Sequence, residues 1–189
     1  PKFAEALSPL AADALAPRIV REMLTAGSAA GVGPMAAVAG VIAEYVGKGL
    51  LQAGCREVMV ENGGDIYIKR KGDCVVAIFA GESPLSLRVG LKLASGNTSM
   101  GVGVCTSSGT VGHSLSFGLA DSVTVVAGST ALADAAATRL GNEVGMSAGG
   151  DSGIQRALEI SREIPGILGV VAICGEKIGA VGGVELTPV

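Results

Sequence analysis

The sequence predicts an α+β fold in which helices pack on a largely antiparallel sheet, within a single domain over residues 1–189. Short extended segments joined by short turns fill the middle of the chain, and short connections join antiparallel neighbours. Helical segments precede and follow this run. The composition is 49% hydrophobic and 3% aromatic with 30 glycines, which indicates a core of small aliphatic side chains and many tight backbone positions.

Three helical segments are expected before the first strand. Residues 4–16 have a helical composition that ends at Pro17, and residues 18–26 continue as a second helix. Pro34 starts a third helix, which extends to residue 53.

This third helix contains the longest apolar stretch, residues 35–51, which approaches the length that spans a membrane. Glu44 and Lys48 lie inside it at helical i, i+4 spacing and are interpreted as a solvated surface pair. The charges and the small alanines of the stretch predict a buried helix of a soluble protein rather than a membrane span.

The extended segments come next, with two more helices near the end of the chain. The predicted strands cover residues 57–60, 66–70, 74–80, 85–94, 100–106 and 121–127, and a C-terminal hairpin covers residues 167–174 and 177–181. A helix from Ser129 or Thr130 to about residue 144 and another over residues 154–163 separate that hairpin from the earlier strands, with a loop over residues 145–153 between the helices.

Charge and cysteine content limit the function. The formal charge of −3 without a basic run argues against nucleic acid and anionic membranes as partners. The 4 cysteines are scattered, which predicts neither a zinc site nor a disulfide framework and favours a reducing cytoplasm. The chain begins at Pro1 rather than at a methionine, so we expect that an N-terminal segment is missing.

The stretch "VENGGDIY" interrupts a strand with two glycines. Asn62 and Gly63 form the dipeptide that two-residue hairpin loops favour, which predicts a tight turn. The second interpretation is a ligand site, where Gly63 and Gly64 expose backbone amides and Asp65 accepts a hydrogen bond. The two interpretations are compatible.

The helical stretch "ADAAATRLG" contains a candidate metal site. Asp134 and Thr138 are four residues apart, so a carboxylate and a hydroxyl project from one helix face. Oxygen ligands of this kind suit Mg²⁺. The alternative is structural: an aspartate favoured early in its helix by the macrodipole, and a threonine bonded to its own helix.

The stretch "CTSSGTVGHS" combines a hydroxyl-rich turn with the chain's only histidine. The turn residues are Thr106, Ser107, Ser108 and Gly109. Such turns bind phosphate, and His113 is a candidate general base, although a solitary histidine is more often a surface or packing residue. Cys105 with His113 is a second candidate pair, for nucleophilic chemistry.

Together the motifs resemble the ApbE-like superfamily, whose best known members are Mg²⁺-dependent FAD:protein FMN transferases. "VENGGDIY" is similar to the family's NxGGD turn, "CTSSG" with His113 to its Thr-Ser-Gly turn and following histidine, and "ADAAATRLG" to its ADAxxT helix. "GVGPMAAVAG" together with "VENGGDIY" resembles a small prokaryotic branch of uncharacterised activity.

The resemblance implies a T-fold-like architecture with a flavin nucleotide, FAD or FMN, beside the turn of residues 62–65. It implies Mg²⁺ held by Asp134, Thr138 and a backbone carbonyl near Ala36 or Ala37, with His113 as the base. T-fold kinship and an aliphatic surface further suggest a homo-oligomer.

The sequence departs from the family pattern at two places. The first motif lacks the family lysine, with Ala36, Ala37 and Val38 in its place, and the run after the histidine is "SLSFGLADS" instead of Ile-x-Asp-Pro. Three functions therefore stay open. The first is flavin or nucleotide binding with Mg²⁺, with phosphoryl or FMN transfer by an enzyme whose site is degenerate. The second is a non-catalytic accessory or binding protein of sulfur assimilation into homocysteine, with a protein partner and with Cys105 and His113 handling sulfur. The third is a module for another metabolite.

Overall fold

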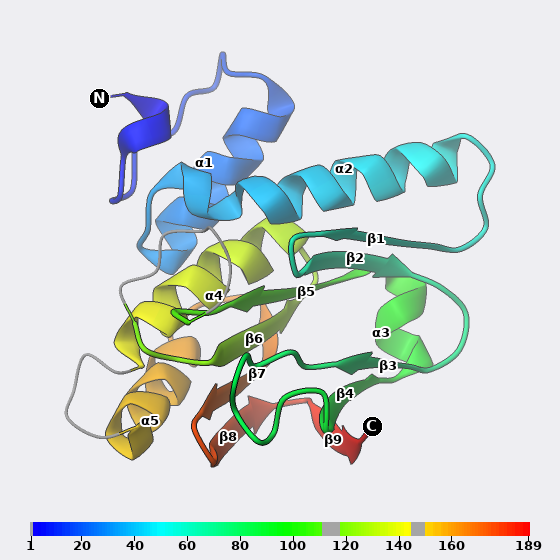
Figure 1. The fold of residues 1–189 in the computed structure, drawn as a ribbon. Coiled ribbons are helices and arrows are strands. Elements are labelled where there is room, and N and C mark those ends of the chain that lie inside the picture. The colour runs from blue at the N-terminus through cyan, green and yellow to red at the C-terminus, as the bar shows by residue number, and fades with distance from the viewer. Residues whose placement is uncertain (1, 111–117, 145–149) are drawn as a thin grey trace.

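The computed structural model describes residues 2–110, 118–144 and 150–189. In this part of the chain the strands form a six-stranded and a three-stranded sheet, both antiparallel throughout. Helices cover one face of the larger sheet, and the smaller sheet packs on the other (Figure 1). The predicted α+β fold is confirmed.

The larger sheet has the strand order β1-β2-β5-β6-β7-β8, and the smaller sheet has the order β3-β4-β9. The strands of the larger sheet are β1 (Val58–Asn62), β2 (Asp65–Lys69), β5 (Val102–Ser107), β6 (Ser122–Ala127), β7 (Ile167–Cys174) and β8 (Lys177–Gly182). Those of the smaller sheet are β3 (Cys74–Ala77), β4 (Val89–Leu93) and β9 (Glu185–Pro188). The chain thus leaves the larger sheet after β2, builds β3 and β4, and returns as β5 beside β2.

Helices α2, α4 and α5 contact the larger sheet, and α1 packs outside them on α4. The helices are α1 (Arg18–Ala30), α2 (Val38–Gln52), α3 (Ser95–Met100), α4 (Thr130–Glu143) and α5 (Gly150–Ser161), with short 3₁₀ helices η1 (Phe3–Glu5) and η2 (Pro34–Ala37). Helix α4 lies at the centre of this layer, because it contacts α1, α2 and α5 as well as β5 and β6.

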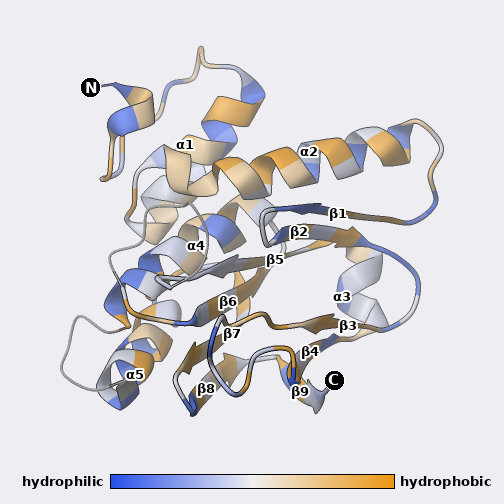
Figure 2. Cartoon of the chain, viewed as in Figure 1, coloured by the Kyte–Doolittle hydropathy of each residue, from blue (hydrophilic) through white to orange (hydrophobic). Residues whose placement is uncertain are grey.

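Two large apolar cores stabilise these layers, one on each face of the larger sheet, and a third, small cluster consists of Ala43, Val58 and Tyr67. Alanines of α4 and valines of β6 form the helical side, and aliphatic residues of β2, β5 and β7 meet β3 and β4 on the other side. Figure 2 shows the corresponding apolar colouring along the inner strands. Small core side chains let the helices lie close to the sheet, as the composition predicts.

Glycines set the close approach of α2 to its neighbours. A Cβ at Gly40 would lie 2.4 Å from the Thr130 carbonyl oxygen on α4. A Cβ at Gly47 would lie 2.3 Å from the Tyr67 ring on β2. Gly40 therefore lets the N-terminal end of α2 pack closely on the start of α4, and Gly47 lets the middle of α2 pack closely on β2.

The observed secondary structure differs from the prediction at four places. Residues 6–16 contain no helix, because alanine-rich composition without a buried apolar face does not hold a helix together, and most of these residues are exposed. Helix α3 and strand β9 were not predicted at all. Helix α5 begins at Gly150, inside the stretch predicted as a loop; the rest of that stretch, residues 145–149, lies outside the described residues.

Helix α2 is buried on one side only, whereas the sequence predicted a buried helix. The stretch Pro34–Gln52 is long and apolar enough to cross a membrane by length and composition, and 39% of its most apolar window is buried. In the fold, α2 contacts α4, β1 and β2 with its inner face. Ile42, Val46 and Leu50 are exposed on the outer face.

Candidate functional site

The stretch "VENGGDIY" forms a tight hairpin between β1 and β2. Asn62 pairs with Asp65, and Gly63 and Gly64 have φ angles of 65° and 97°. Positive φ at both central positions is what a type I′ turn requires, so the turn prediction is confirmed. The Asn62 side-chain amide donates to the Ala39 carbonyl oxygen at 3.1 Å, which ties the turn to the first turn of α2.

Asp134 links α4 to the same end of α2. Its Oδ2 accepts a hydrogen bond of 2.8 Å from the backbone N–H of Gly40. Gly40 lies in the first turn of α2, where backbone N–H groups have no partner within the helix. Asp134 therefore accepts a hydrogen bond at the N-terminus of α2. The structural alternative had placed its effect at the N-terminus of its own helix, α4.

Glu44 makes the reciprocal contact. Its Oε2 accepts a hydrogen bond of 2.7 Å from the backbone N–H of Thr130, the first residue of α4, and its Oε1 lies 2.6 Å from the Lys48 Nζ. Glu44 is buried, so its interpretation as a solvated surface residue was wrong. The two helices thus cap each other's N-termini with one carboxylate each.

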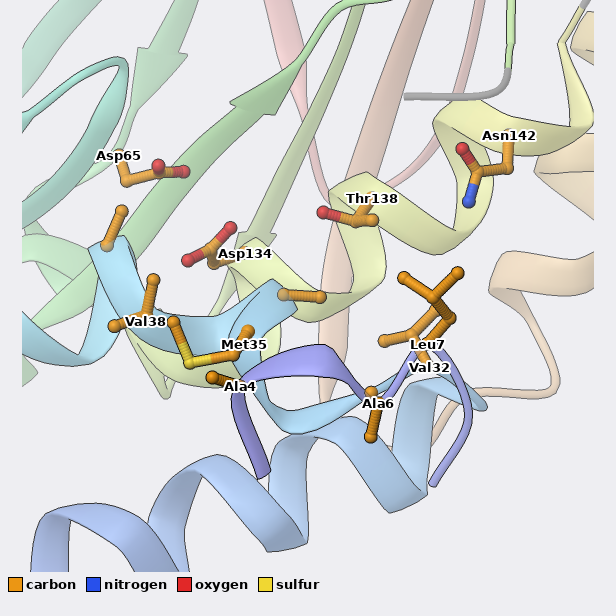
Figure 3. A pocket seen from close by; sticks show the side chains of 13 residues that line it. Ala4, Ala6, Leu7, Val32, Met35, Val38, Asp65, Asp134, Thr138 and Asn142 are labelled. Carbon is orange, nitrogen blue, oxygen red and sulfur yellow. The ribbon is translucent and has the colours of Figure 1, made fainter. Parts of the chain in front are cut away.

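A cavity of about 300 Å³ lies where the hairpin, α4 and the start of α2 meet. Its polar wall consists of Asp65, Asp134, Thr138 and Asn142, which Figure 3 shows in a row across the cavity from the apolar side chains. The other lining residues are Ala4, Ala6, Leu7, Val32, Gly33, Met35, Ala36, Val38 and Ala39. The cavity is amphipathic, with oxygen and amide groups on one side and aliphatic groups on the other.

The predicted hairpin and metal motifs therefore meet at one cavity. Asp65 comes from β2, and Asp134 and Thr138 come from α4. The third predicted metal ligand, Ala37, is fully buried in η2, while its neighbours Ala36 and Val38 line the cavity. A role for the carbonyl of Ala37 stays a prediction.

The electrostatics of the cavity favour a cation. Burial raises the pKa of the Asp65 carboxyl to about 7. Burial and the Asp65 carboxylate raise the pKa of Asp134 well above its usual range, against the lowering effect of the Gly40 and Ala39 amides. No basic residue is among the described residues that line the cavity, so a cation entering it meets carboxylates and no competing charge.

Asp65 also carries an atom without a partner. Its Oδ1 is buried and accepts no hydrogen bond from any described residue. A buried acceptor left in this state costs about 1–3 kcal/mol, which a bound cation or donor would recover. The oxygen donor set of Asp65, Asp134 and Thr138 is of the kind that Mg²⁺ prefers.

The hydroxyl-rich turn lies beside the hairpin but not in the cavity. Asp65 pairs with Cys105 across β2 and β5, so the two motifs run side by side. The side chains of the turn point elsewhere: Thr106 bonds Thr124 at 2.9 Å, and Ser108 bonds Thr110 at 3.3 Å. Of the four turn residues, none lines the cavity that the structure describes, and their role in phosphate binding stays a prediction.

Ser107 and Gly109 of this turn pack against neighbouring backbone. A Cβ at Gly141 of α4 would lie 3.3 Å from the Ser107 Oγ, and a Cβ at Gly109 would lie 2.0 Å from the Gly118 carbonyl oxygen. The turn is therefore held tightly next to the C-terminal half of α4. His113 lies outside the described residues, and its role as a base stays a prediction.

Cys105 is poorly placed for sulfur chemistry. Its side chain is fully buried, and its Sγ donates to the Thr130 carbonyl oxygen at 3.4 Å. Burial raises the pKa of the Cys105 thiol well above its usual value, and the carboxylates of Asp65 and Asp134 raise it further. A thiol in these surroundings is protonated and shielded, which counts against Cys105 as the sulfur-handling residue of the second hypothesis.

Two parts of the cavity lining were not predicted from the sequence, namely Asn142 and residues 4–7. Asn142 follows Thr138 by four residues, so the polar spacing that pointed to Asp134 and Thr138 continued for one more turn. The N-terminal strap, residues 4–7, closes the apolar side and is held by a 3.0 Å hydrogen bond from the Gly33 N–H to the Leu7 carbonyl oxygen. No local pattern marks such a strap, because its contacts are made with residues far along the chain.

Comparison with known proteins identifies the family of this chain. The family model AbpE bacteria matches residues 1–179. The chain belongs to this family. A UPF0280 protein of Methanococcus aeolicus is 45% identical over 183 residues, which cover 96% of this chain and 73% of the relative. A UPF0280 protein of Methanosarcina acetivorans is 42% identical over 182 residues, covering 96% and 70% of the two chains.

The fold of this AbpE family member also resembles a solved structure. The crystal structure of the ApbE protein from Thermotoga maritima has a TM-score of 0.58 at 17% identity, covering 79% of this chain. This chain spans 50% of the length of that structure. The match of the family model to residues 1–179 confirms membership of the ApbE-like superfamily, and the T-fold assignment stays a prediction.

Proposed function

We propose that the cavity binds a flavin or a related nucleotide together with Mg²⁺. The observation that carries the proposal is the convergence of the Asp65 and Asp134 carboxylates and the Thr138 hydroxyl on one cavity whose opposite wall is aliphatic. Membership of a superfamily best known for Mg²⁺-dependent FAD:protein FMN transferases supports the flavin assignment.

The shape and polarity of the cavity suit an amphipathic ligand. A volume of about 300 Å³ is at the lower end of the range for small-molecule sites, so it holds part of a dinucleotide rather than all of it. The aliphatic wall, with Met35 and Val38, offers a surface for a flat ring, and the polar wall offers oxygen and amide groups.

Asp134 and Thr138 would hold the metal, with Asp65 facing it from β2. When bound there, Mg²⁺ would supply the positive charge that offsets the ligand phosphate, because no described lining residue is basic. The Gly40 amide fixes the Asp134 carboxylate through Oδ2, so this side chain is oriented before any ligand arrives. Preorganisation of this kind reduces the entropy lost on binding.

The extended form of the proposal is group transfer. In that reaction, with FAD as the donor, the oxygen of an acceptor hydroxyl bonds to the phosphorus of the FMN half. The P–O bond to the other phosphate breaks, AMP leaves, and the hydroxyl proton passes to a base, the predicted role of His113. The family lysine is absent from this sequence, so the cavity lacks the charge-assisted contact that a lysine would make with phosphate. Nucleotide binding is therefore the core of the proposal, and transfer is its second stage.

Titration calorimetry with FAD, FMN and ADP, each with and without Mg²⁺, tests the binding stage. We expect heat only when Mg²⁺ is present. Asp134→Asn keeps an acceptor for the Gly40 amide while removing the charge, so it should weaken binding at least about tenfold without unfolding α2. Thr25→Ala, which removes an exposed hydroxyl on α1, is the control for Thr138→Ala. Absence of heat from all three ligands with Mg²⁺ would overturn the proposal.

The sulfur-assimilation alternative is left without a structural argument, since Cys105 is inaccessible. The predicted self-association and the predicted protein partner stay predictions.

A further inference from the structure

One peptide group at the start of α2 joins the hairpin to α4. The Ala39 carbonyl oxygen accepts a hydrogen bond of 3.1 Å from the Asn62 side-chain amide. The Gly40 N–H donates a hydrogen bond of 2.8 Å to the Asp134 Oδ2. This carbonyl and this N–H belong to the same planar peptide bond, on which they point in opposite directions. Asn62 and Asp134, which lie far apart in the sequence, therefore bind the two ends of one rigid unit.

Packing at Gly40 leaves this unit little room to move. A Cβ at Gly40 would lie 2.8 Å from the Asp134 Cβ and 2.4 Å from the Thr130 carbonyl oxygen, so bare backbone is seated directly on α4. From the other side, the Asn62 amide ties the same peptide to the hairpin. The position of the hairpin therefore affects the N–H that holds the Asp134 carboxylate.

The two hydrogen bonds also strengthen each other. A donor at the carbonyl oxygen of a peptide group polarises that group and makes its N–H a better donor, so such chains are cooperative inside a protein. Both hydrogen bonds are partly buried, where water competes less for the donors and acceptors. Loss of the Asn62 amide should therefore weaken the bond between the Gly40 N–H and Asp134.

Asn62 itself does not line the cavity. Asp65, at the other end of the hairpin turn, is a lining residue, whereas Asn62 is not among the described residues of the lining. The carboxylates of Asp65 and Asp134 lie near each other in the cavity (Figure 3). The resemblance to the family motif predicts Asn62 beside the nucleotide, but in the structure its amide donates to the backbone of α2.

We infer that Asn62 is a positioning residue for the metal, because through the Ala39–Gly40 peptide it fixes the Asp134 carboxylate in the orientation that binds a cation. The inference rests on the proposed function, since it concerns the metal that Asp134 and Thr138 would hold. It assigns Asn62 to the metal rather than to direct contact with the nucleotide. Metal affinity should therefore depend on Asn62 even when no nucleotide is present.

Calorimetry of the full chain with Mg²⁺ alone, and with ADP in the presence of Mg²⁺, tests this. Asn62→Ala should weaken the binding of Mg²⁺ alone about threefold to tenfold, the loss expected for one hydrogen bond. Asn62→Gln keeps an amide donor and should bind Mg²⁺ more tightly than Asn62→Ala. The matched control is Val60→Ala on β1, which removes apolar contacts with the small cluster of Ala43, Val58 and Tyr67. It should lower the thermal unfolding temperature and leave the Mg²⁺ affinity unchanged.

An NMR signature separates positioning from general support of the fold. The Gly40 amide proton should shift upfield in Asn62→Ala, because its hydrogen bond to Asp134 weakens. The same proton should keep its shift in Val60→Ala, although that variant is less stable. Thermal unfolding of each variant verifies that it is folded.

The outcomes separate the two proposals. If the wild-type protein binds nucleotides with Mg²⁺ but does not bind the metal alone, or if Asn62→Ala binds Mg²⁺ alone as tightly as the wild type, the inference is wrong and the proposed function stands. A Gly40 resonance that does not move in Asn62→Ala would also overturn the inference, and so would a loss of ADP affinity without a loss of Mg²⁺ affinity. If the wild-type protein binds neither Mg²⁺ nor a nucleotide, both proposals fail.

Discussion

The Glu44 carboxylate accepts a 2.7 Å hydrogen bond from the backbone N–H of Thr130, which lies 86 residues further along the chain. Asp134 returns the contact by accepting from the Gly40 N–H at 2.8 Å. Each carboxylate satisfies an orphan donor in the first turn of the other helix, where a negative charge also complements the helix dipole. The two contacts fix the relative position of α2 and α4, and the cavity lies beside one of them.

Glu44→Ala should lower the free energy of unfolding by about 1–3 kcal/mol, because it leaves the Thr130 N–H buried without an acceptor. Glu44→Gln keeps an acceptor at this place and should lose less. Urea denaturation measures both variants. If the glutamine variant is as unstable as the alanine variant, the charge of Glu44, including its pairing with Lys48, is the stabilising element instead of the cap.

Asp65 should make the protein less stable as pH rises. The carboxyl has a pKa of about 7 in the fold and about 3.9 in an unfolded chain, so the folded state binds more protons between these values. Stability contributed by the protonated form is complete below about pH 4 and is lost as pH rises to about 7. The Asp65→Asn side chain does not ionise, so this variant does not lose stability in this way. Its free energy of unfolding should therefore rise relative to that of the wild-type protein as pH increases, by at most about 4 kcal/mol.

Urea unfolding of the wild-type and Asp65→Asn proteins at about pH 4.5 and about pH 8 tests this. Each pH lies about 0.5–1 unit from one end of the range between the unfolded-state and folded-state pKa values of Asp65. Asp13→Asn, a change at an exposed aspartate, is the control. Parallel pH profiles for the wild-type and Asp65→Asn proteins would contradict the prediction. Added Mg²⁺ should stabilise the wild-type protein most at pH 8, because protons then compete least for the carboxylates.

Gly33→Ala should release the N-terminal strap. A Cβ at Gly33 would lie 1.7 Å from the Ala6 carbonyl oxygen and 3.1 Å from the Leu7 Cα, so the strap has to move. Limited proteolysis should then cut within residues 2–16 at a lower protease concentration than in the wild-type protein. The matched control is Gly49→Ala in α2, where nothing lies within 4 Å of the added Cβ; it should raise stability by about 0.5–1 kcal/mol. Equal protease resistance of the Gly33→Ala and wild-type proteins would show that the strap is not seated as described.

Alkylation at neutral pH should label the cysteines in order of exposure. Cys55 is exposed, whereas Cys74 and Cys105 are buried. We expect rapid labelling of Cys55 and labelling of Cys105 only under unfolding conditions. Mass spectrometry of peptides over time gives the order. Rapid labelling of Cys105 that His113→Ala abolishes would revive the sulfur-assimilation hypothesis.

Local sequence patterns were sufficient for most of the larger sheet and for α4. The hairpin at Gly63 and Gly64 was predictable because its turn chemistry is local. The failures lie where local composition does not decide the structure. A helix was predicted over residues 4–16 from composition alone, but no apolar face of that segment is buried, and α3 was missed because Ser95–Met100 consists mainly of weak helix formers.

The site was predictable only where its residues share an element or match a family motif. Asp134 and Thr138 share a helix face, and Asn142 continued the same spacing without being singled out. The functions of Glu44 and Gly33 depend on contacts with Thr130 and Ala6, which are distant in sequence and leave no periodic signal. Charge patterning therefore placed Glu44 on the surface, where an isolated helix would have exposed it.

Under the proposed function, Asp134 would hold the metal and also accept the hydrogen bond of the Gly40 N–H, which affects how this family can evolve. A descendant protein that no longer used its cavity would still be selected to keep this aspartate, because without it the first turn of α2 loses an acceptor. If the proposed metal site were lost, substitutions would be expected first at Thr138, one turn further along α4.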